Sequence, residues 1–252
     1  MKIRWWFFLI IVMTFLSYPI FSHAGELVVS AAISLKNAFV ELGALHEKAH
    51  PDTKVRFNFG ASGDLARQIA GGAPVDLFAS AAQKDMDDLA VQGLIISNSR
   101  IDFAKNSVVL ITPNGSSIRS FQDLASPQVK RIAVGNPKTV PAGRYAYEVF
   151  NHYGLLPQIY TKLIYAENVR QVLDYVVRAE VDAGVVYATD AHIKNTEIFT
   201  AASAAPDSHK PVLYPIAIVK NTKNAKAAAA FINTVRSQEG IKILTKYGFL
   251  IP

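Results

Sequence analysis

The sequence contains no cysteine among its 252 residues. A chain without cysteine has no disulfide, no thiol nucleophile, no cysteine-bound zinc and no iron–sulfur cluster. Small secreted domains usually need disulfides, whereas a chain of this length, one large domain or two small ones, can bury enough surface without them. We therefore expect a protein that its hydrophobic core stabilises.

Charged residues are few and evenly spread. Lys and Arg number 26 against 20 Asp and Glu, which gives a formal net charge of +6, and no run of five like charges occurs. Without a basic arm the sequence is not typical of a nucleic-acid-binding protein. Hydrophobic residues make up 50% of the chain, which excludes a disordered or coiled-coil protein.

The long apolar run of the sequence is confined to its N-terminus. Two basic residues precede an apolar stretch at residues 5–16, and the small residues Ser22 and Ala24 stand at the −3 and −1 positions of a cleavage site. This pattern predicts a secretory signal peptide over residues 1–24. An uncleaved anchor helix is the alternative, but the stretch is short for a membrane span. Since no cysteine follows it, we expect no lipid anchor and a soluble, exported chain.

Short β-rich runs alternate with helical stretches after residue 24. The apolar patterns predict strands at residues 27–29, 55–59, 75–79, 108–112, 131–134, 163–165, 184–187 and 212–219. They predict helices at 35–45, 65–70, 84–92, 142–153, 169–179 and 225–247. This alternation predicts an α/β fold with mixed, mostly parallel sheets and helices on both faces. Two sheets are favoured, because about ten strands would overfill a single open sheet.

Four predicted helices begin where a predicted strand has just ended. These starts lie at Ser34, at Ser62, at residues 141–143 and at Asn168. Open α/β sheets bind ligands outside the carboxyl ends of their strands, and a helix N-terminus offers unpaired N–H groups to an anion. A serine in this place is ordinarily an N-cap, and we expect Ser34 and Ser62 at N-cap positions. The alanines and glycines around them leave the backbone open to a ligand and point to a pocket.

Several segments in chain order resemble the periplasmic molybdate-binding proteins of ABC transporters, a type II periplasmic solute-binding family. The resemblance implies a two-lobed periplasmic binding protein fold with a ligand cleft between the lobes. Lobe one would comprise residues 25–107 and 214–252, lobe two residues 108–213, and the hinge would lie near residues 108–112 and 214–217. The segments that carry the resemblance are Ala31–Ala38, Phe59–Ile69, Gly72–Ala81, Ala133–Pro137, Val140–Gly143, Ala166–Arg170, Gly184–Tyr187 and Lys246–Phe249.

The resemblance also implies the residues that hold the ligand. Ser34 and Ser62 would donate their hydroxyls and backbone N–H groups, Ala142 and Val169 their backbone N–H groups, and Tyr187 its phenol. These groups would hold a tetrahedral molybdate or tungstate dianion through hydrogen bonds alone, with no residue acting as a direct metal-cation ligand. The family often has hydroxyl residues on both sides of the second serine. This chain has Ala61 and Gly63 there, which leaves backbone donation intact.

The function implied by the resemblance is transport and not catalysis. The protein would be a periplasmic monomer without a cofactor that captures molybdate and tungstate. It would close around the ligand and deliver it to the membrane permease and ATPase of an ABC transporter. Nucleic acid would not be a partner.

Three alternatives remain open from the sequence. The same fold could bind another tetrahedral oxyanion such as sulfate, or the chain could be a scaffold or adhesion module without ligand-induced closure. It could also be an exported zinc hydrolase, because His46, Glu47 and His50 fit the H-E-x-x-H pattern of zinc proteases. Pro51 follows directly, and the residue before a proline is pushed out of helical geometry, which argues against this reading.

Three charged residues near these segments have simpler interpretations. Arg144 and Arg170 could add positive potential at the cleft, but we interpret them as solvated helix residues, since a site of hydroxyls and amides does not need them. Asp76 lies between apolar neighbours, and we expect it to form structural hydrogen bonds.

Overall fold

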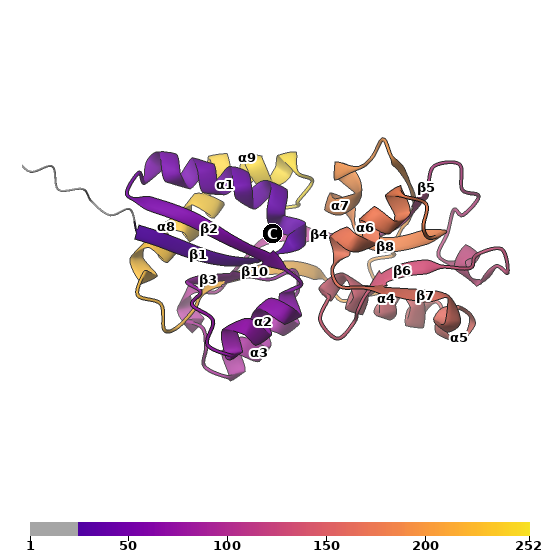
Figure 1. Ribbon diagram of the computed structural model, residues 1–252, viewed down its shortest axis with the longest axis horizontal. Helices are drawn as coiled ribbons and strands as arrows, with labels where there is room; N and C mark the ends of the chain where they lie inside the picture. The colour runs from indigo at the N-terminus through magenta and orange to yellow at the C-terminus, as the bar shows by residue number, and fades with distance from the viewer. Residues whose placement is uncertain (1–24) are drawn as a thin grey trace, which may run out of the picture.

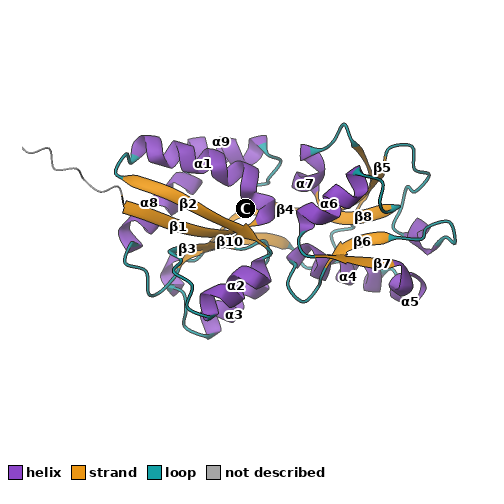
Figure 2. Cartoon of the chain, in the orientation of Figure 1, coloured by secondary structure: helices purple, strands orange, loops and turns teal. Residues whose placement is uncertain are grey.

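The computed structural model describes residues 25–252. The predicted signal peptide lies outside the described residues. Two five-stranded sheets lie end to end along the long axis of the molecule, and helices cover both faces of each sheet (Figures 1 and 2). We call each sheet with its helices a lobe. The prediction of two mixed sheets is confirmed.

Lobe one contains the sheet with strand order β2-β1-β3-β10-β4. Helices α1, α8 and α9 pack on one of its faces, and α2 and α3 pack together on the other (Figure 1). Its strands are β1 (Gly25–Ala32), β2 (Thr53–Gly60), β3 (Leu77–Ala79), β4 (Ile101–Asn106) and β10 (Val212–Ile218). Its helices are α1 (Lys36–Ala49), α2 (Ser62–Ala70), α3 (Gln83–Val91), α8 (Ala225–Arg236) and α9 (Gln238–Lys246). Two 3-10 helices, η1 (Ile33–Leu35) and η2 (Ser97–Ser99), complete it.

Lobe two contains the sheet with strand order β7-β6-β8-β5-β9. Helices α6 and α7 lie on one face, and α4 and α5 on the other (Figure 1). Its strands are β5 (Val108–Pro113), β6 (Ile132–Gly135), β7 (Leu163–Ala166), β8 (Ala183–Tyr187) and β9 (Ile198–Ser203). Its helices are α4 (Pro141–His152), α5 (Leu156–Ile159), α6 (Val169–Val177) and α7 (Ala188–Ile193), with the 3-10 helices η3 (Gln122–Ala125) and η4 (Tyr160–Lys162).

Parallel and antiparallel pairings occur equally in the described sheets. In lobe one, β1 pairs in parallel with β2 and β3, while β10 runs antiparallel between β3 and β4. In lobe two, β6 pairs in parallel with β7 and β8, while β5 runs antiparallel between β8 and β9. In each sheet one strand, β10 or β5, therefore runs against the other four, which all point the same way. The sheets are mixed and mostly parallel, as the sequence predicts.

The chain crosses from one sheet to the other at Ser107, between β4 and β5, and returns over residues 204–211, between β9 and β10. The segments that the sequence suggested as the hinge, residues 108–112 and 214–217, are parts of strands β5 and β10 and lie beside these crossings. The crossings bring the carboxyl ends of β1 and β2 opposite the helix starts of lobe two.

Two strands, the short helices α5 and α7, and one helix end were missed from the sequence. Strands β4 and β9 lie at the sheet edges. Strand β9 buries only Ile198, and β4 buries only Phe103, Ala104 and Asn106, so neither shows a clear apolar pattern. The helical tail predicted over residues 225–247 is two helices, because Ser237 is extended and its Oγ accepts a hydrogen bond from Gly240 N at 3.0 Å. Within residues 25–252, no helix has the length and apolarity that a membrane crossing requires.

Candidate functional site

A small cavity lies between the two lobes, and its walls include every residue that the sequence proposed as a ligand. Ser34 and Ser62 come from lobe one, and Ala142, Val169 and Tyr187 from lobe two. About 200 Å³ at this place is free of protein atoms, and this volume includes space that is open to the solvent. Its other walls are Ala32, Ile33, Gly60, Ala61, Ala81, Val140 and Pro141. No charged side chain lines it.

Four of these residues lie in the first turn of a helix. Ser34 is in η1, which leads directly into α1, and Ser62 is the first residue of α2. Val169 is the first residue of α6, and Ala142 follows Pro141 at the start of α4. The N–H groups of a first helical turn have no acceptor within their own helix. In the described chain these four N–H groups make no other hydrogen bond, so they can donate into the cavity.

The two serines are not N-caps, which corrects the sequence-based expectation. The caps are Ala32 before η1 and Ala61 before α2, both in extended conformation, and neither cap makes a side-chain hydrogen bond. Ser62 Oγ instead accepts a hydrogen bond from Ala81 N at 3.0 Å. Ser34 Oγ lies 3.1 Å from the phenol oxygen of Tyr214. Both hydroxyls are held by other groups of lobe one, and neither caps its own helix.

Asn168 is the N-cap of α6, at the helix start that the sequence predicts. Its side-chain oxygen accepts hydrogen bonds from Arg170 N at 3.0 Å and Gln171 N at 3.1 Å. This cap satisfies the second and third N–H groups of α6 and leaves the first, that of Val169, facing the cavity. The local sequence therefore both starts the helix and selects which N–H group stays open to a ligand.

Tyr187 closes the cavity from lobe two and already has a partner in lobe one. Its phenol donates a hydrogen bond to the carbonyl of Ala81 at 3.1 Å. The side chain is almost completely buried, and this burial raises the pKa of the phenol well above its usual value. The phenol is therefore neutral at all physiological pH values and keeps the hydrogen that a ligand would need.

The positive residues near the site belong to ion pairs behind its walls. Arg144 pairs with Asp85 of lobe one, and the two side chains are 17% and 4% exposed. Arg170 pairs with Asp190 and also donates across the cleft to Asn37 Oδ1 at 3.1 Å. Both arginines are thus mostly buried and paired, which corrects their interpretation as solvated residues. Burial raises the pKa values of both carboxyls, and their arginine partners act in the opposite direction.

Direct contacts between the lobes surround the cavity. Gly63 N donates to Thr139 O at 2.9 Å, and a side chain at position 63 would lie 2.8 Å from Thr139. Together with the Arg144–Asp85 and Tyr187–Ala81 contacts, this describes a closed cleft. Glycine at position 63, where the family often has a hydroxyl residue, is the residue that permits this close approach.

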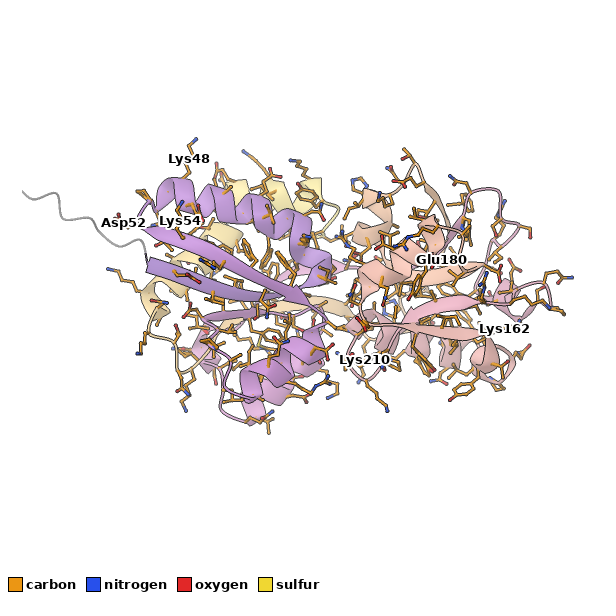
Figure 3. All side chains as sticks on the ribbon, in the orientation of Figure 1. Lys48, Asp52, Lys54, Lys162, Glu180 and Lys210 are labelled. Atoms are coloured by element: carbon orange, nitrogen blue, oxygen red, sulfur yellow. The ribbon has the colours of Figure 1, made fainter. Side chains whose placement is uncertain are left out.

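The H-E-x-x-H segment lies at the far end of α1 from the cavity and is engaged in structural contacts. The carboxylate of Glu47 accepts from Lys54 Nζ and from Val55 N, each at 2.9 Å. His46 is buried, and its Nδ1 lies 2.8 Å from Thr234 Oγ1. Helix α1 ends at Ala49, so His50 has already left helical geometry, as Pro51 predicts. Lys48 projects outward from this helix (Figure 3).

No third ligand completes a metal site at this segment. Within residues 25–252, no group of three or more His, Cys, Asp or Glu side chains is arranged to hold a metal ion. The Glu47 carboxylate would also have to give up two hydrogen bonds to act as a general base. The geometry thus argues against the zinc hydrolase alternative.

Asp76 forms the structural hydrogen bonds expected of it. Its carboxylate accepts from Val28 N at 2.7 Å, from the Thr222 hydroxyl and from Asn224 Nδ2. These bonds tie β1, β3 and the segment before α8 together at the outer end of lobe one. Sequence reasoning missed Tyr214 and Asn106, two buried polar residues behind Ser34, because nothing in a single sequence places them beside it.

Two lobes that close on a small cavity of hydrogen-bond donors define a two-lobed periplasmic binding protein. The chain belongs to the family of bacterial extracellular solute-binding proteins, whose model matches residues 27–250.

Relatives are similar along almost their whole length. A putative ABC transporter substrate-binding lipoprotein of Bacillus subtilis, YvgL, is 41% identical over 226 residues, which cover 88% of this chain and 85% of the relative. The molybdate-binding protein ModA of Escherichia coli is 37% identical over 233 residues, 90% of each chain. The solved substrate-binding domain of a putative molybdenum ABC transporter from Clostridium difficile superimposes with a TM-score of 0.71 at 38% identity, over 90% of this chain and 99% of that one.

Proposed function

We propose that this protein captures molybdate, and tungstate with it, in the cavity between its lobes and delivers the anion to the permease of an ABC transporter. The ligands would be Ser34, Ser62, Ala142, Val169 and Tyr187. The protein would act as a monomer in the periplasm after removal of its signal peptide. Binding and closure, without turnover of the ligand or a cofactor, would be its whole activity.

The observation that carries this proposal is the chemistry of the cavity wall. It presents four backbone N–H groups, two serine hydroxyls and one phenol from both lobes, and no carboxylate. A tetrahedral dianion accepts hydrogen bonds on every oxygen and donates none. Each hydrogen bond to a charged group contributes ~1.5–3 kcal/mol, so a full set can offset the dehydration of such an ion.

The two-lobed arrangement supports a mechanism of closure. A dianion that accepts from Ser62 in lobe one and from Val169 in lobe two binds the closed form better than the open form. It therefore shifts the hinge equilibrium by that difference in affinity. The closed form would be the one that the permease recognises.

The relatives support the choice of ligand and partner. The Escherichia coli relative is named a molybdate-binding protein, and the Bacillus subtilis and Clostridium difficile relatives are named as binding components of ABC transporters.

A thermal-shift series on ligand-stripped residues 25–252 tests the proposal. Molybdate, tungstate, sulfate, phosphate and zinc are added separately, each over a range of concentrations. A ligand at about 100 times its Kd adds ~2.7 kcal/mol to the free energy of unfolding, which raises the melting temperature measurably. We expect a rise with molybdate and tungstate at micromolar concentration and none with sulfate or phosphate.

Ser62→Ala locates the site in the same experiment, because it removes one hydroxyl donor from the cavity. Ser208→Ala is the matched control, since Ser208 is equally buried and bonds only to Ala205 O, away from the cleft. A shift with sulfate alone would mean that the ligand of this protein is sulfate and not molybdate. No shift with any oxyanion would overturn the transport function, and a shift with zinc alone would favour a hydrolase.

A further inference from the structure

The buried polar residues behind Ser34 form a chain of hydrogen bonds that runs from the crossing between the lobes to the cavity. Asn106, the last residue of β4, lies beside the crossing at Ser107. Tyr214 lies on β10, is fully buried, and is within 3.1 Å of both Asn106 Nδ2 and Ser34 Oγ. Ser34 ends the chain at the cavity wall.

The direction of the first hydrogen bond is fixed by the backbone. Asn106 Oδ1 accepts from Ser107 N at 2.9 Å, and a backbone N–H can only donate. The other side of the amide must therefore be the NH₂ group. It donates to Thr189 Oγ1 at 2.8 Å and to the phenol oxygen of Tyr214.

The direction of the second hydrogen bond follows by elimination. Burial raises the pKa of Tyr214 well above its usual value, so the phenol keeps its hydrogen. A buried hydroxyl needs an acceptor, and the NH₂ group of Asn106 cannot accept. The remaining partner of this phenol among the described residues is Ser34 Oγ. Tyr214 therefore donates to Ser34.

The Ser34 hydroxyl then has its hydrogen free for the cavity. Ser62 reaches the same state by another route, because Ala81 N donates to its Oγ. We infer that Asn106 and Tyr214 are positioning residues that fix the Ser34 hydroxyl as a donor, and that this polarity makes the site reject oxyanions that carry a proton. The inference rests on the proposed function and adds to it the residues that decide between protonated and unprotonated anions.

The inference predicts how sulfate and hydrogen phosphate differ at this site. Both are tetrahedral dianions of similar size at pH 8, but hydrogen phosphate carries a hydrogen that needs an acceptor. With Ser34 and Ser62 both fixed as donors, that hydrogen would meet another hydrogen. The ratio of the sulfate and hydrogen phosphate affinities therefore reports whether the two serine hydroxyls donate or accept. Ligand size and charge do not contribute to this ratio.

The experiment measures the Kd values of molybdate, sulfate and hydrogen phosphate by calorimetry, with competition against molybdate for the weak anions. The wild type is compared with Tyr214→Phe and with Tyr145→Phe. Tyr145 is a matched control, because it is a buried phenol near Tyr187 whose hydroxyl bonds to Pro211 O and not to Ser34. In Tyr214→Phe the Ser34 hydroxyl can rotate and accept.

We expect Tyr214→Phe to weaken molybdate binding about threefold to tenfold, the loss of one neutral hydrogen bond. We also expect the preference for sulfate over hydrogen phosphate to fall by a similar factor. Tyr145→Phe should change neither value. Equal weakening of all three anions, or no change beyond that of Tyr145→Phe, would overturn the inference. Failure of the wild type to bind molybdate would instead overturn the proposed function.

Asn106→Asp provides a second variant, which reverses the direction of the hydrogen bonds between residue 106, Tyr214 and Ser34. Its carboxylate would accept from Tyr214, which turns the phenol hydrogen away from Ser34 and makes Ser34 donate to the phenol. The added negative charge weakens both dianions alike, so the ratio still reports polarity. We expect the ratio to move toward hydrogen phosphate further than in Tyr214→Phe. An unchanged ratio in a folded Asn106→Asp protein would contradict the inference.

Discussion

The single hydroxyl hydrogen of Tyr187 can be donated to either of two acceptors. In the closed structure it donates to Ala81 O across the cleft, and with a ligand it would donate to an oxygen of the anion. Both roles stabilise the closed form, the first by joining the lobes and the second by joining lobe two to the ligand. Burial raises the pKa of this phenol, so neither role is lost at alkaline pH within the physiological range.

Tyr187→Phe is expected to raise the molybdate Kd by about 10- to 100-fold, the value of one hydrogen bond to a charged group. Isothermal titration calorimetry measures this change. Tyr153→Phe removes a phenol hydroxyl that lies outside the cavity lining and serves as control. Equal Kd values for the two variants would show that the Tyr187 hydroxyl contributes nothing to binding.

The contact between α1 and α8 contains a histidine that resists protonation. Burial lowers the pKa of His46 to about 4, and the neighbouring His50 adds to the effect. Thr234 Oγ1 donates to Ala230 O, so it accepts from His46 Nδ1, which therefore carries the hydrogen. The ring packs at 5.3 Å from that of Phe231. The H-E-x-x-H segment thus contributes to the packing of two helices.

This histidine makes stability depend on pH. The unfolded chain protonates His46 below about pH 6.5 and the folded chain only below about pH 4. The free energy of unfolding should therefore be constant above pH 6.5 with respect to this group and fall by up to about 3 kcal/mol as the pH drops to 4.

Urea denaturation at pH 7.5 and pH 4.5 measures the difference for the wild type and for His46→Asn. Asparagine keeps a donor for Thr234 but does not titrate. The His46→Asn protein should therefore lose less stability between pH 7.5 and pH 4.5 than the wild type. A loss as large as that of the wild type would assign the pH dependence to other groups.

The sequence predicts those elements whose apolar pattern decides their position. Residues 36–49 form α1 because Ala38, Phe39 and Leu42 recur on one buried face. The sequence does not reveal β9, an edge strand that is largely exposed, or the true cap of α2, because Ala61 caps only by its extended backbone. Local pattern therefore predicts the order of elements better than their ends.

The site was predictable for a different reason. The resemblance of ordered segments supplied Ser34, Ser62, Ala142, Val169 and Tyr187, and the structure places all five around one cavity. That they bind the ligand stays a prediction. The contacts behind the walls were not predictable, because they join residues that are far apart in the sequence.

The closed arrangement of the two lobes depends on contacts that exist only when the lobes meet. Arg144 from lobe two pairs with Asp85 from lobe one, and both side chains are mostly buried. Opening the cleft would return both charges to water. The pair therefore bears on the equilibrium between open and closed forms more than on the folding of either lobe.

Arg144→Gln should weaken molybdate binding about tenfold or more, because the closed form would then bury the Asp85 carboxylate without a partner. Arg67→Gln is the control, since the Arg67–Asp64 pair is exposed and lies within α2. Small-angle scattering of the ligand-bound proteins should show a larger radius of gyration for Arg144→Gln than for Arg67→Gln. Identical affinities in the two variants would remove this ion pair from the closure mechanism.

Gly63→Ala tests closure by steric means. The added methyl group would lie 2.8 Å from the Cα and carbonyl of Thr139, so the lobes could not approach as closely. We expect a higher molybdate Kd and a smaller ligand-induced decrease in the radius of gyration, with little change in stability without ligand. Gly25→Ala is the control, because the nearest atom to its new methyl group is 3.9 Å away. A normal decrease in radius for Gly63→Ala would contradict the closed geometry.

The position of β10 in the sheet of lobe one affects the order in which the protein can be assembled. This strand is the last of the ten described, yet it lies between β3 and β4 and pairs with both. The sheet of lobe two is complete once the chain has passed Ser203, whereas that of lobe one, which begins at Gly25, stays divided until Ile218 arrives. A chain that emerges from its N-terminus must therefore finish its second lobe before its first. During that interval β3 and β4 each present an unpaired edge. A strand of another chain could pair with either edge.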